Sequence, residues 1–301
     1  MQAVTNRRLV TAAALLLALP VAVSACASVN ASREQARRDS TDGRLFVERA
    51  GAGSPTYVFL PGMTGSTSYW RGAGMLQWNG PGRVILMDEL GFGRSPWPDT
   101  AYTLDEHLDA IERTLRAEGA NEELILVGHS FGSILGVHYA ARYPDRVRRL
   151  VLFGTPVYRS RAEARGRLGE MSFLAGMIVR NRHLAHALCT LHMSVYPVAE
   201  RLAVHLRSEL PQPVLRDSVM HFWPSLDGSV RNVVLGAPVE AVLPRIGPKV
   251  VFVHGSRDGI TPMNRIREVA SANGAGVLAT DDDHNSYWRT AKDRIQHILE
   301  Q

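Results

Sequence analysis

A single serine stands between two glycines in Gly128-His129-Ser130-Phe131-Gly132. An apolar run, Leu124 to Val127, precedes this pentapeptide, and a helical pattern, Ile134 to Arg142, follows it. The G-x-S-x-G spacing between a strand and a helix allows a sharp turn that lifts the serine hydroxyl above a sheet. A hydroxyl in that place is suited to nucleophilic attack on a carbonyl. A plain glycine-serine turn is the simpler interpretation, and the flanking strand and helix argue against it.

A serine nucleophile needs a base, and the base needs an acid that orients it. The apolar run Val250 to His254 leads into a loop that contains Asp258. His284 follows the last short apolar run, Gly276 to Ala279. Because ligands bind at the carboxyl ends of parallel strands, we expect Asp258 and His284 to lie at the same sheet edge as Ser130. A solvated turn carboxylate and a surface histidine are the alternatives.

Two glycine-rich loops follow other predicted strands. Gly62-Met63-Thr64-Gly65 comes after the run Thr56 to Leu60, and Asp88-x-x-Gly91-x-Gly93-x-Ser95 comes after Arg83 to Met87. The second loop lacks the third glycine of a dinucleotide fingerprint, and two prolines after it block a helix. We therefore expect it to be structural and to shape one wall of the site.

The elements that must position these residues alternate between strand and helix. Helical spacing behind Thr103-x-x-Glu106, a capping box, predicts a helix through Leu115. Thr261-Pro262 predicts another, with threonine as N-cap and proline at the first helical position. This alternation predicts an α/β fold with a mostly parallel, doubly wound sheet. The other predicted strands are Leu45 to Glu48, Glu123 to Val127, Arg149 to Phe153 and Lys249 to His254.

Residues 156–245 break the alternation, because no convincing strand pattern occurs there. We expect an inserted helical cap that divides the core into residues 44–155 and 246–301. Methionines and aromatic residues in the cap indicate an apolar, adaptable pocket, or equally the plain core of the cap. These residues are Met171, Phe173, Met177, Met193, Met220, Phe222 and Trp223.

The N-terminus has the parts of a secretory signal. Arg7 and Arg8 precede an apolar run, Leu9 to Val23, which is shorter than the roughly 20 residues of a membrane span. Val23-Ser24-Ala25-Cys26 resembles the lipobox of bacterial lipoproteins, in which the cysteine is acylated. We expect a signal peptide over 1–25, a lipid-anchored tether over 26–43, and export to a bacterial cell membrane. An ordinary signal peptide with a stray cysteine is the alternative.

The charge of the chain excludes some partners. The 301 residues carry a net charge of +5, which is +3 without Arg7 and Arg8. That balance is too mild for nucleic-acid binding, and no basic stripe with interleaved aromatic residues is present. The scattered histidines lack the pairing of a zinc site, so we expect no metal and no cofactor. The sequence does not indicate an oligomeric state.

Taken in this order, the motifs resemble those of the α/β-hydrolase fold superfamily over roughly residues 45 to 300. The resemblance implies Ser130 as nucleophile, Asp258 as acid and His284 as general base. It also implies that the backbone N–H groups of Met63 and Phe131 bind an oxyanion. Pro61 stands where the family often has histidine, but the oxyanion donors are backbone groups. His254, in a strand, and His297, in a terminal helix, are less suitable bases.

The resemblance implies a serine hydrolase of carboxylic esters with apolar substrates. An amidase or aminopeptidase, an acyltransferase and a cofactor-free perhydrolase would use the same three residues. A serine at position 130 argues against epoxide hydrolases and dehalogenases, which have aspartate there. Because a fold does not determine a function, a non-catalytic lipid-binding envelope lipoprotein is also an alternative.

Overall fold

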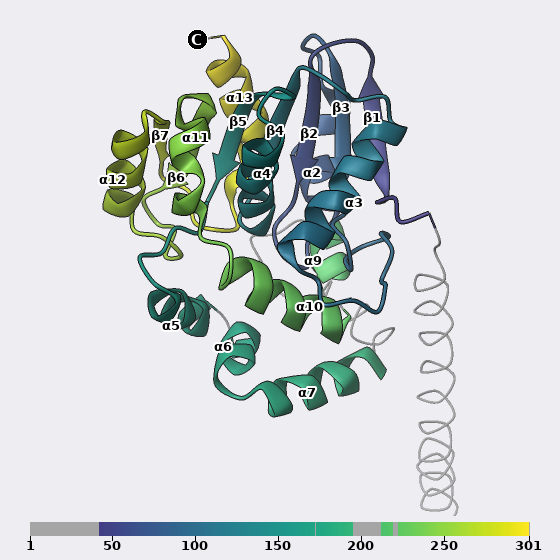
Figure 1. The fold of residues 1–301 in the computed structure, drawn as a ribbon, viewed down its shortest axis with the longest axis vertical. Coiled ribbons are helices and arrows are strands. Elements are labelled where there is room, and N and C mark those ends of the chain that lie inside the picture. Colours follow the sequence, from purple (N-terminus) through teal and green to yellow (C-terminus); the bar gives the residue numbers. More distant parts are fainter. Residues whose placement is uncertain (1–41, 172, 195–211, 219–221, 301) are drawn as a thin grey trace, which may run out of the picture.

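The sheet of this protein has seven strands in the order β1-β3-β2-β4-β5-β6-β7 (Figure 1). The structure is a computed structural model that describes residues 42–171, 173–194, 212–218 and 222–300. β1 pairs antiparallel with β3, and every other pair is parallel, which confirms the predicted mostly parallel sheet. The strands are β1 Val47–Gly51, β2 Thr56–Leu60, β3 Arg83–Met87, β4 Leu124–His129, β5 Val147–Phe153, β6 Val250–Gly255 and β7 Gly276–Thr280.

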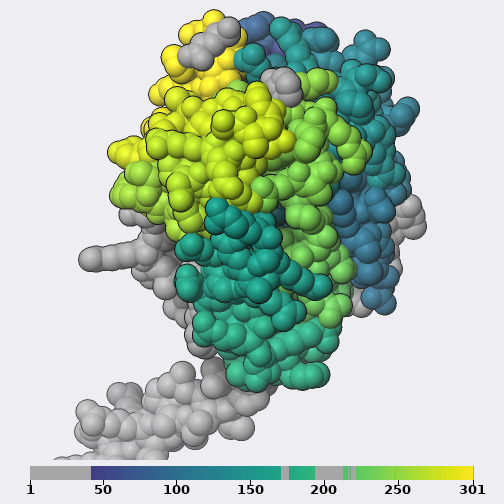
Figure 2. Space-filling view, turned by 60° about the vertical axis from the view of Figure 1, so that its left-hand side comes forward, coloured from purple at the N-terminus to yellow at the C-terminus, as the bar shows by residue number. Residues whose placement is uncertain are grey.

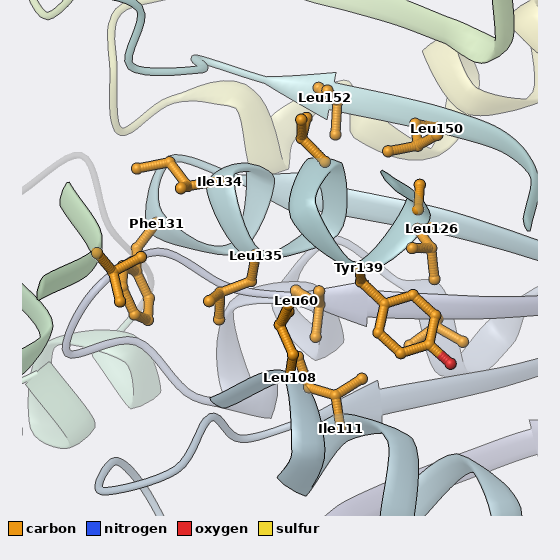
Figure 3. Packing of buried hydrophobic residues seen from close by; sticks show 14 of the residues in the cluster. Leu60, Leu108, Ile111, Leu126, Phe131, Ile134, Leu135, Tyr139, Leu150 and Leu152 are labelled. Carbon is orange, nitrogen blue, oxygen red and sulfur yellow. The ribbon is translucent and has the colours of Figure 1, made fainter. Parts of the chain in front are cut away.

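Helices cover both faces of this sheet. Successive strand residues point to opposite sides, and residues on both sides are apolar and buried. Val58 and Leu60 of β2 pack with α3, α4, α11 and α12, while Tyr57 and Phe59 pack with α2 and α13. Figure 3 shows the first of these layers, in which α4 side chains lie against strand residues. The core helices are α2 Thr67–Gly72, α3 Leu104–Ala117, α4 Phe131–Arg142, α11 Leu243–Ile246, α12 Met263–Asn273 and α13 Ala291–Leu299.

Between β5 and β6, the described residues of the segment 156–245 form helices and no strand. These helices are α5 Arg161–Met171, α6 Phe173–Arg180, α7 Arg182–Ser194, α9 Gln212–Ser218 and α10 Trp223–Ser229, followed by a π-helical turn, Val230–Val234. In Figure 1, α5, α6, α7 and α10 lie together below the sheet. In Figure 2 the teal surface of this segment adjoins the yellow-green surface of the core. That residues 156–245 form a separate cap with these boundaries stays a prediction.

Several predicted elements begin at a different residue in the structure; β5, for example, starts at Val147 rather than Arg149. β1 starts at Val47 rather than Leu45, because its pairing with β3 begins at Val47↔Met87, while the Leu45 N–H donates to the Thr114 hydroxyl. α12 starts at Met263 with Pro262 as its N-cap, so Thr261 does not cap it. The Thr261 hydroxyl instead donates to the Thr155 carbonyl and accepts from the Val157 N–H. The capping box of α3 at Thr103 and Glu106 is confirmed.

The predicted signal peptide, Cys26 and nearly all of the tether lie outside the described residues. Within those residues, no helix has both the length and the apolar character that a membrane crossing requires.

Candidate active site

Ser130 occupies a strained turn between β4 and α4. Its backbone has φ 50° and ψ −112°, a region that residues with a side chain rarely adopt. Such strain persists only where the surrounding structure imposes it, and it is concentrated at functional sites. The Ser130 N–H donates to the Phe153 carbonyl of β5 at 3.0 Å, which fastens the turn to the sheet.

The glycines on either side of Ser130 are required by close backbone contacts. A methyl group at Gly128 would lie 2.6 Å from the Cα of Ser133. At Gly132 it would lie 2.4 Å from the carbonyl oxygens of Leu60 and Pro61. The G-x-S-x-G spacing therefore lets α4 begin directly beneath the serine.

The structure brings Ser130, His284 and Asp258 together from three separate loops. The distance from His284 Nε2 to the Ser130 Oγ is 2.9 Å, and that from His284 Nδ1 to Asp258 Oδ2 is also 2.9 Å. An ionised carboxylate only accepts hydrogen bonds, so Nδ1 carries a proton and donates to Asp258. Nε2 is then the acceptor for the Ser130 hydroxyl, which is the arrangement a general base needs.

Asp258 is buried but stays ionised. Burial raises the pKa of this carboxyl, but the hydrogen bond from His284 and the neighbouring charges and donors outweigh it and lower the pKa to about 2. Its oxygens also accept from the Tyr287 hydroxyl at 2.8 Å and from the Ile260 N–H at 2.9 Å. Burial raises the pKa of Tyr287, so this phenol stays a neutral donor. Asp258 thus has three hydrogen-bond donors.

Asp258 also makes stability depend on pH, and an Asp258→Asn variant should remove that dependence. Because the folded-state pKa lies below the ordinary value of about 3.9, the stabilisation is present above about pH 4 and lost as pH falls toward 2. The shift corresponds to roughly 2 kcal/mol. Urea unfolding at pH 6 and pH 2.5 should show a smaller loss of stability in the variant than in the wild type. Asp281→Asn, at an exposed carboxylate, should behave like the wild type; equal losses in both variants would refute the assignment.

His129, beside the nucleophile in sequence, holds the loop that carries His284. Its Nε2 lies 2.8 Å from the His284 carbonyl oxygen, and its ring stacks on Tyr69 at 4.8 Å and 5°. Burial, with the neighbouring His284, lowers the pKa of His129 to about 3, so the ring is neutral and Nε2–H is the donor. Its Nδ1 is buried and has no hydrogen-bond partner among the described residues. A methyl group at Gly62 would lie 2.9 Å from that atom.

His129 and Tyr287 are the two residues of the site that sequence reasoning missed. Tyr287 is three residues after His284, which is only a weak signal. His129 occupies a variable position of the G-x-S-x-G pattern, so the pattern assigns it no role.

Met63 and Phe131, the predicted oxyanion donors, line the same cavity as Ser130. Neither N–H makes any of the loop or turn hydrogen bonds between backbone groups of the described residues. The Gly132 N–H donates to the Pro61 carbonyl at 2.9 Å and so ties the Met63 loop to the start of α4. Within that loop Thr64 has a positive φ of 62°, and the Gly65 N–H closes the turn on the Gly62 carbonyl at 2.8 Å. Within the described part of the chain, both amides are therefore left for a ligand beside Ser130.

Two hollows adjoin each other beside Ser130 and His284. The first, named here the apolar cavity, has a volume of about 160 Å³ and contains Ser130 and Phe131. The second, named here the polar hollow, has a volume of about 670 Å³ and contains His284 and His129. Met63, Thr64 and Ile260 line both.

Branched aliphatic side chains supply most of the cap's share of the apolar cavity, and among the described residues Met177, Met193, Phe222 and Trp223 do not line it. Met220 lies outside the described residues. The residues of the segment 156–245 that line it are Pro156, Tyr158, Leu168, Ile178, Val179, Leu226, Val230 and Val234. Phe222 stacks on Trp97 at 5.6 Å, Trp223 stacks on His186 at 5.0 Å, and Met177 packs against the cap's own core. For Met177, Phe222 and Trp223 the interpretation as plain packing fits better. Cys189 is buried in the same cap core.

Among the described residues, no group of three or more His, Cys, Asp or Glu side chains could hold a metal ion.

Comparison with known proteins places this geometry in a family. The sequence model of the alpha/beta hydrolase fold family matches residues 55–289. The chain is 27% identical over 243 residues to the Arabidopsis thaliana protein named probable lysophospholipase BODYGUARD 4. That match covers 75% of this chain and 57% of the relative, and matches to two further plant relatives cover 49% and 48% of them. The chain thus spans about half the length of the curated relatives it matches.

Solved structures share the fold at low sequence identity. An E-2-(acetamidomethylene)succinate hydrolase superposes with a TM-score of 0.65 at 19% identity, over 85% of this chain and 94% of that one. An esterase from Exiguobacterium antarcticum superposes with a TM-score of 0.60 at 18% identity, over 85% and 94%. With the family match over most of its length, the chain belongs to the alpha/beta hydrolase fold family.

Proposed function

We propose that this chain is a serine hydrolase that cleaves carboxylic esters of apolar acids through an acyl-enzyme on Ser130. The observation that carries the proposal is the series of hydrogen bonds from Asp258 through His284 to Ser130, with a cavity beside the serine. The same series supports hydrolysis over a non-catalytic binding role, because a lipid carrier needs no oriented base.

The proposed reaction has two halves. Ser130 Oγ bonds to the ester carbonyl carbon as its proton passes to His284 Nε2, and the Met63 and Phe131 N–H groups stabilise the oxyanion. The carbon–oxygen bond to the leaving alcohol then breaks, and that alcohol takes the proton from Nε2. A water repeats the sequence on the acyl-enzyme, which releases the acid and restores the serine. The reaction needs no cofactor.

The apolar cavity is the proposed site of the acyl group. Its aliphatic lining favours hydrocarbon over polar groups. A cavity of roughly 150 Å³ is known to hold a benzene ring, so about six carbon atoms fit the observed 160 Å³. A relative named as a probable lysophospholipase and a structural neighbour named as an esterase support an ester substrate.

A panel of p-nitrophenyl esters of graded chain length, beside p-nitroanilides of the same acids, tests this proposal. We expect turnover of the esters, with the highest kcat/KM near hexanoate and little turnover of the anilides. Faster cleavage of the anilides would favour an amidase, and the absence of turnover and of labelling by a fluorophosphonate probe would overturn the proposal.

We also propose that Cys26 carries a lipid that holds the exported protein at a bacterial cell membrane. The support is the sequence alone: an apolar run, small residues before the cysteine and a polar tether after it. Mass analysis of the native N-terminus tests it, and an unmodified Cys26 would refute it.

His129 is expected to be a positioning residue for this reaction. His129→Phe keeps a ring against Tyr69 but removes the donor to the His284 carbonyl, whereas His129→Gln keeps an N–H near the Nε2 position. A displacement of about 1 Å at a reacting centre costs up to about 10²-fold in rate. We therefore expect kcat to fall at least about tenfold in His129→Phe, with KM little altered, and to recover largely in His129→Gln.

The pair of variants separates positioning from packing. If His129→Phe keeps the activity and His129→Gln loses it, the stacking on Tyr69 matters and the donor does not. Because His129 does not titrate near neutral pH, the pH profile of kcat should keep its midpoint in both variants.

A further inference from the structure

The polar hollow lies on the side of the triad where an ester's leaving group must go. His284 Nε2 has to give its proton to the leaving oxygen, so that oxygen must lie beside His284. His284 lines the polar hollow, and Ser130 and Phe131 line the apolar cavity. An ester whose acyl chain lies in the apolar cavity would therefore place its alcohol in the polar hollow.

Charged side chains of both signs surround this hollow. On the cap side they are Arg167 and Glu170 of α5, and on the core side Arg257 and Asp283 from the loops around the triad. Arg167 is half-buried, while Arg257 and Glu170 are exposed at the rim. Each wall of the hollow thus offers one cation and one anion.

None of these four side chains has an ion-pair partner within the described part of the chain. Other arginines do have them: Arg146 pairs with Glu112, and Arg182 with Asp227. The Arg257 Nε donates to the Asp281 carbonyl, which orients the guanidinium and leaves its terminal N–H groups available. The Asp283 carboxylate accepts the Asn285 N–H at Oδ1, and no other hydrogen bond to it comes from the described residues. Charges that line a hollow beside the proposed base, and that have no ion-pair partner among the described residues, favour a charged ligand.

The presence of two positive and two negative side chains around the hollow limits the charge that a ligand there can carry. A purely anionic group would be repelled by Glu170 and Asp283, and a purely cationic one by Arg167 and Arg257. Arginine presents a planar fork of donors that matches phosphate oxygens. A volume of about 670 Å³ lies within the range of small-molecule sites.

We propose that the polar hollow binds the ester's leaving group, and that this group is zwitterionic, with a phosphate at Arg167 and Arg257 and an ammonium at Glu170 and Asp283. A glycerophosphocholine or glycerophosphoethanolamine alcohol has this chemistry. The inference rests on the proposed function, because a leaving group exists only if the chain cleaves esters.

Four hexanoyl esters that differ only in the leaving alcohol test the inference. The alcohols are glycerol, glycerol 3-phosphate, glycerophosphocholine and choline, which are neutral, anionic, zwitterionic and cationic. The short acyl chain is common to all four and keeps them monomeric in solution. We expect kcat/KM for the zwitterionic ester to exceed that for the neutral ester at least tenfold, and the other two to fall below the zwitterionic ester.

Variants of the hollow are compared through the ratio of kcat/KM for the zwitterionic and neutral esters, since a general loss of folding or catalysis cancels in that ratio. Arg167→Gln and Arg257→Gln should each lower the ratio about tenfold. Arg161→Gln, at an exposed arginine of α5 outside the hollow, should keep the wild-type ratio. Glu170→Gln should lower the preference for the zwitterionic over the anionic ester.

A wild-type ratio near one, or a ratio that Arg167→Gln and Arg257→Gln leave intact, would overturn this inference alone. Equal or faster cleavage of the anionic ester would also overturn the zwitterionic assignment. No turnover of any of the four esters or of p-nitrophenyl hexanoate would overturn the proposed function, and this inference with it.

Discussion

Replacing Ser130 by alanine is expected to lower kcat for an ester substrate by about 10⁶-fold, the scale seen when a serine hydrolase loses its nucleophile. Among the described residues, this hydroxyl alone is on the turn after β4 and within hydrogen-bond distance of His284 Nε2. Alanine removes one oxygen atom and leaves the glycines around the turn in place, so the fold should be retained. Initial rates on p-nitrophenyl hexanoate, with circular dichroism as the check on folding, measure the effect.

A fluorophosphonate probe should label the wild type and not the Ser130→Ala variant. Ser256→Ala is the matched control, because Ser256 is an exposed serine two residues before Asp258. It should be labelled at the wild-type rate. Labelling that persists in Ser130→Ala would show that another residue is the nucleophile.

The central strands could be predicted closely from the sequence. β2 and β3 have the predicted bounds, Thr56–Leu60 and Arg83–Met87. Both are buried on two faces, so each appears in the sequence as a short apolar run between polar residues. The edge strand β1 was misplaced because its register depends on its partner β3, which local sequence does not specify.

The start of α12 shows how a long-range contact overrides a local signal. Threonine before proline is a good helix start by local rules. The Thr261 hydroxyl, however, bonds to the segment after β5, about a hundred residues earlier. Its side chain is therefore not available to cap the helix, and Pro262 becomes the N-cap.

In the site, too, residues marked by a local motif could be predicted, and residues that act through long-range contacts could not. The order of Ser130, Asp258 and His284 could be inferred because a family motif marks each loop, and the structure brings the three together. Tyr287 and His129 act through contacts with Asp258 and with a backbone carbonyl, and no spacing rule encodes such contacts. The sequence left open whether the large cap side chains line the pocket or pack, because a local pattern does not show what a side chain contacts; Phe222 packs on Trp97 of the core.

Replacing His284 by alanine is expected to lower kcat by about 10⁶-fold as well, because serine without its base is a weak nucleophile near neutral pH. The side chain is mostly buried, with 13% of its surface exposed, and its loop is held independently through the backbone carbonyl that accepts from His129. The alanine variant keeps that carbonyl, so the loop and the fold should persist. Rates on p-nitrophenyl hexanoate measure the loss, and thermal unfolding checks the fold.

The neighbouring histidine cannot replace the missing base. The ring of His129 lies 5.0 Å from that of His284, but its Nε2 proton is committed to the carbonyl of residue 284. Burial lowers the pKa of His129 to about 3, which makes it a poor acceptor at neutral pH. The double variant His284→Ala/His129→Gln should therefore be no less active than His284→Ala alone. His297→Ala, at an exposed position of α13, should keep wild-type activity, and more than about 1% residual activity in His284→Ala would show that a different group takes the serine proton.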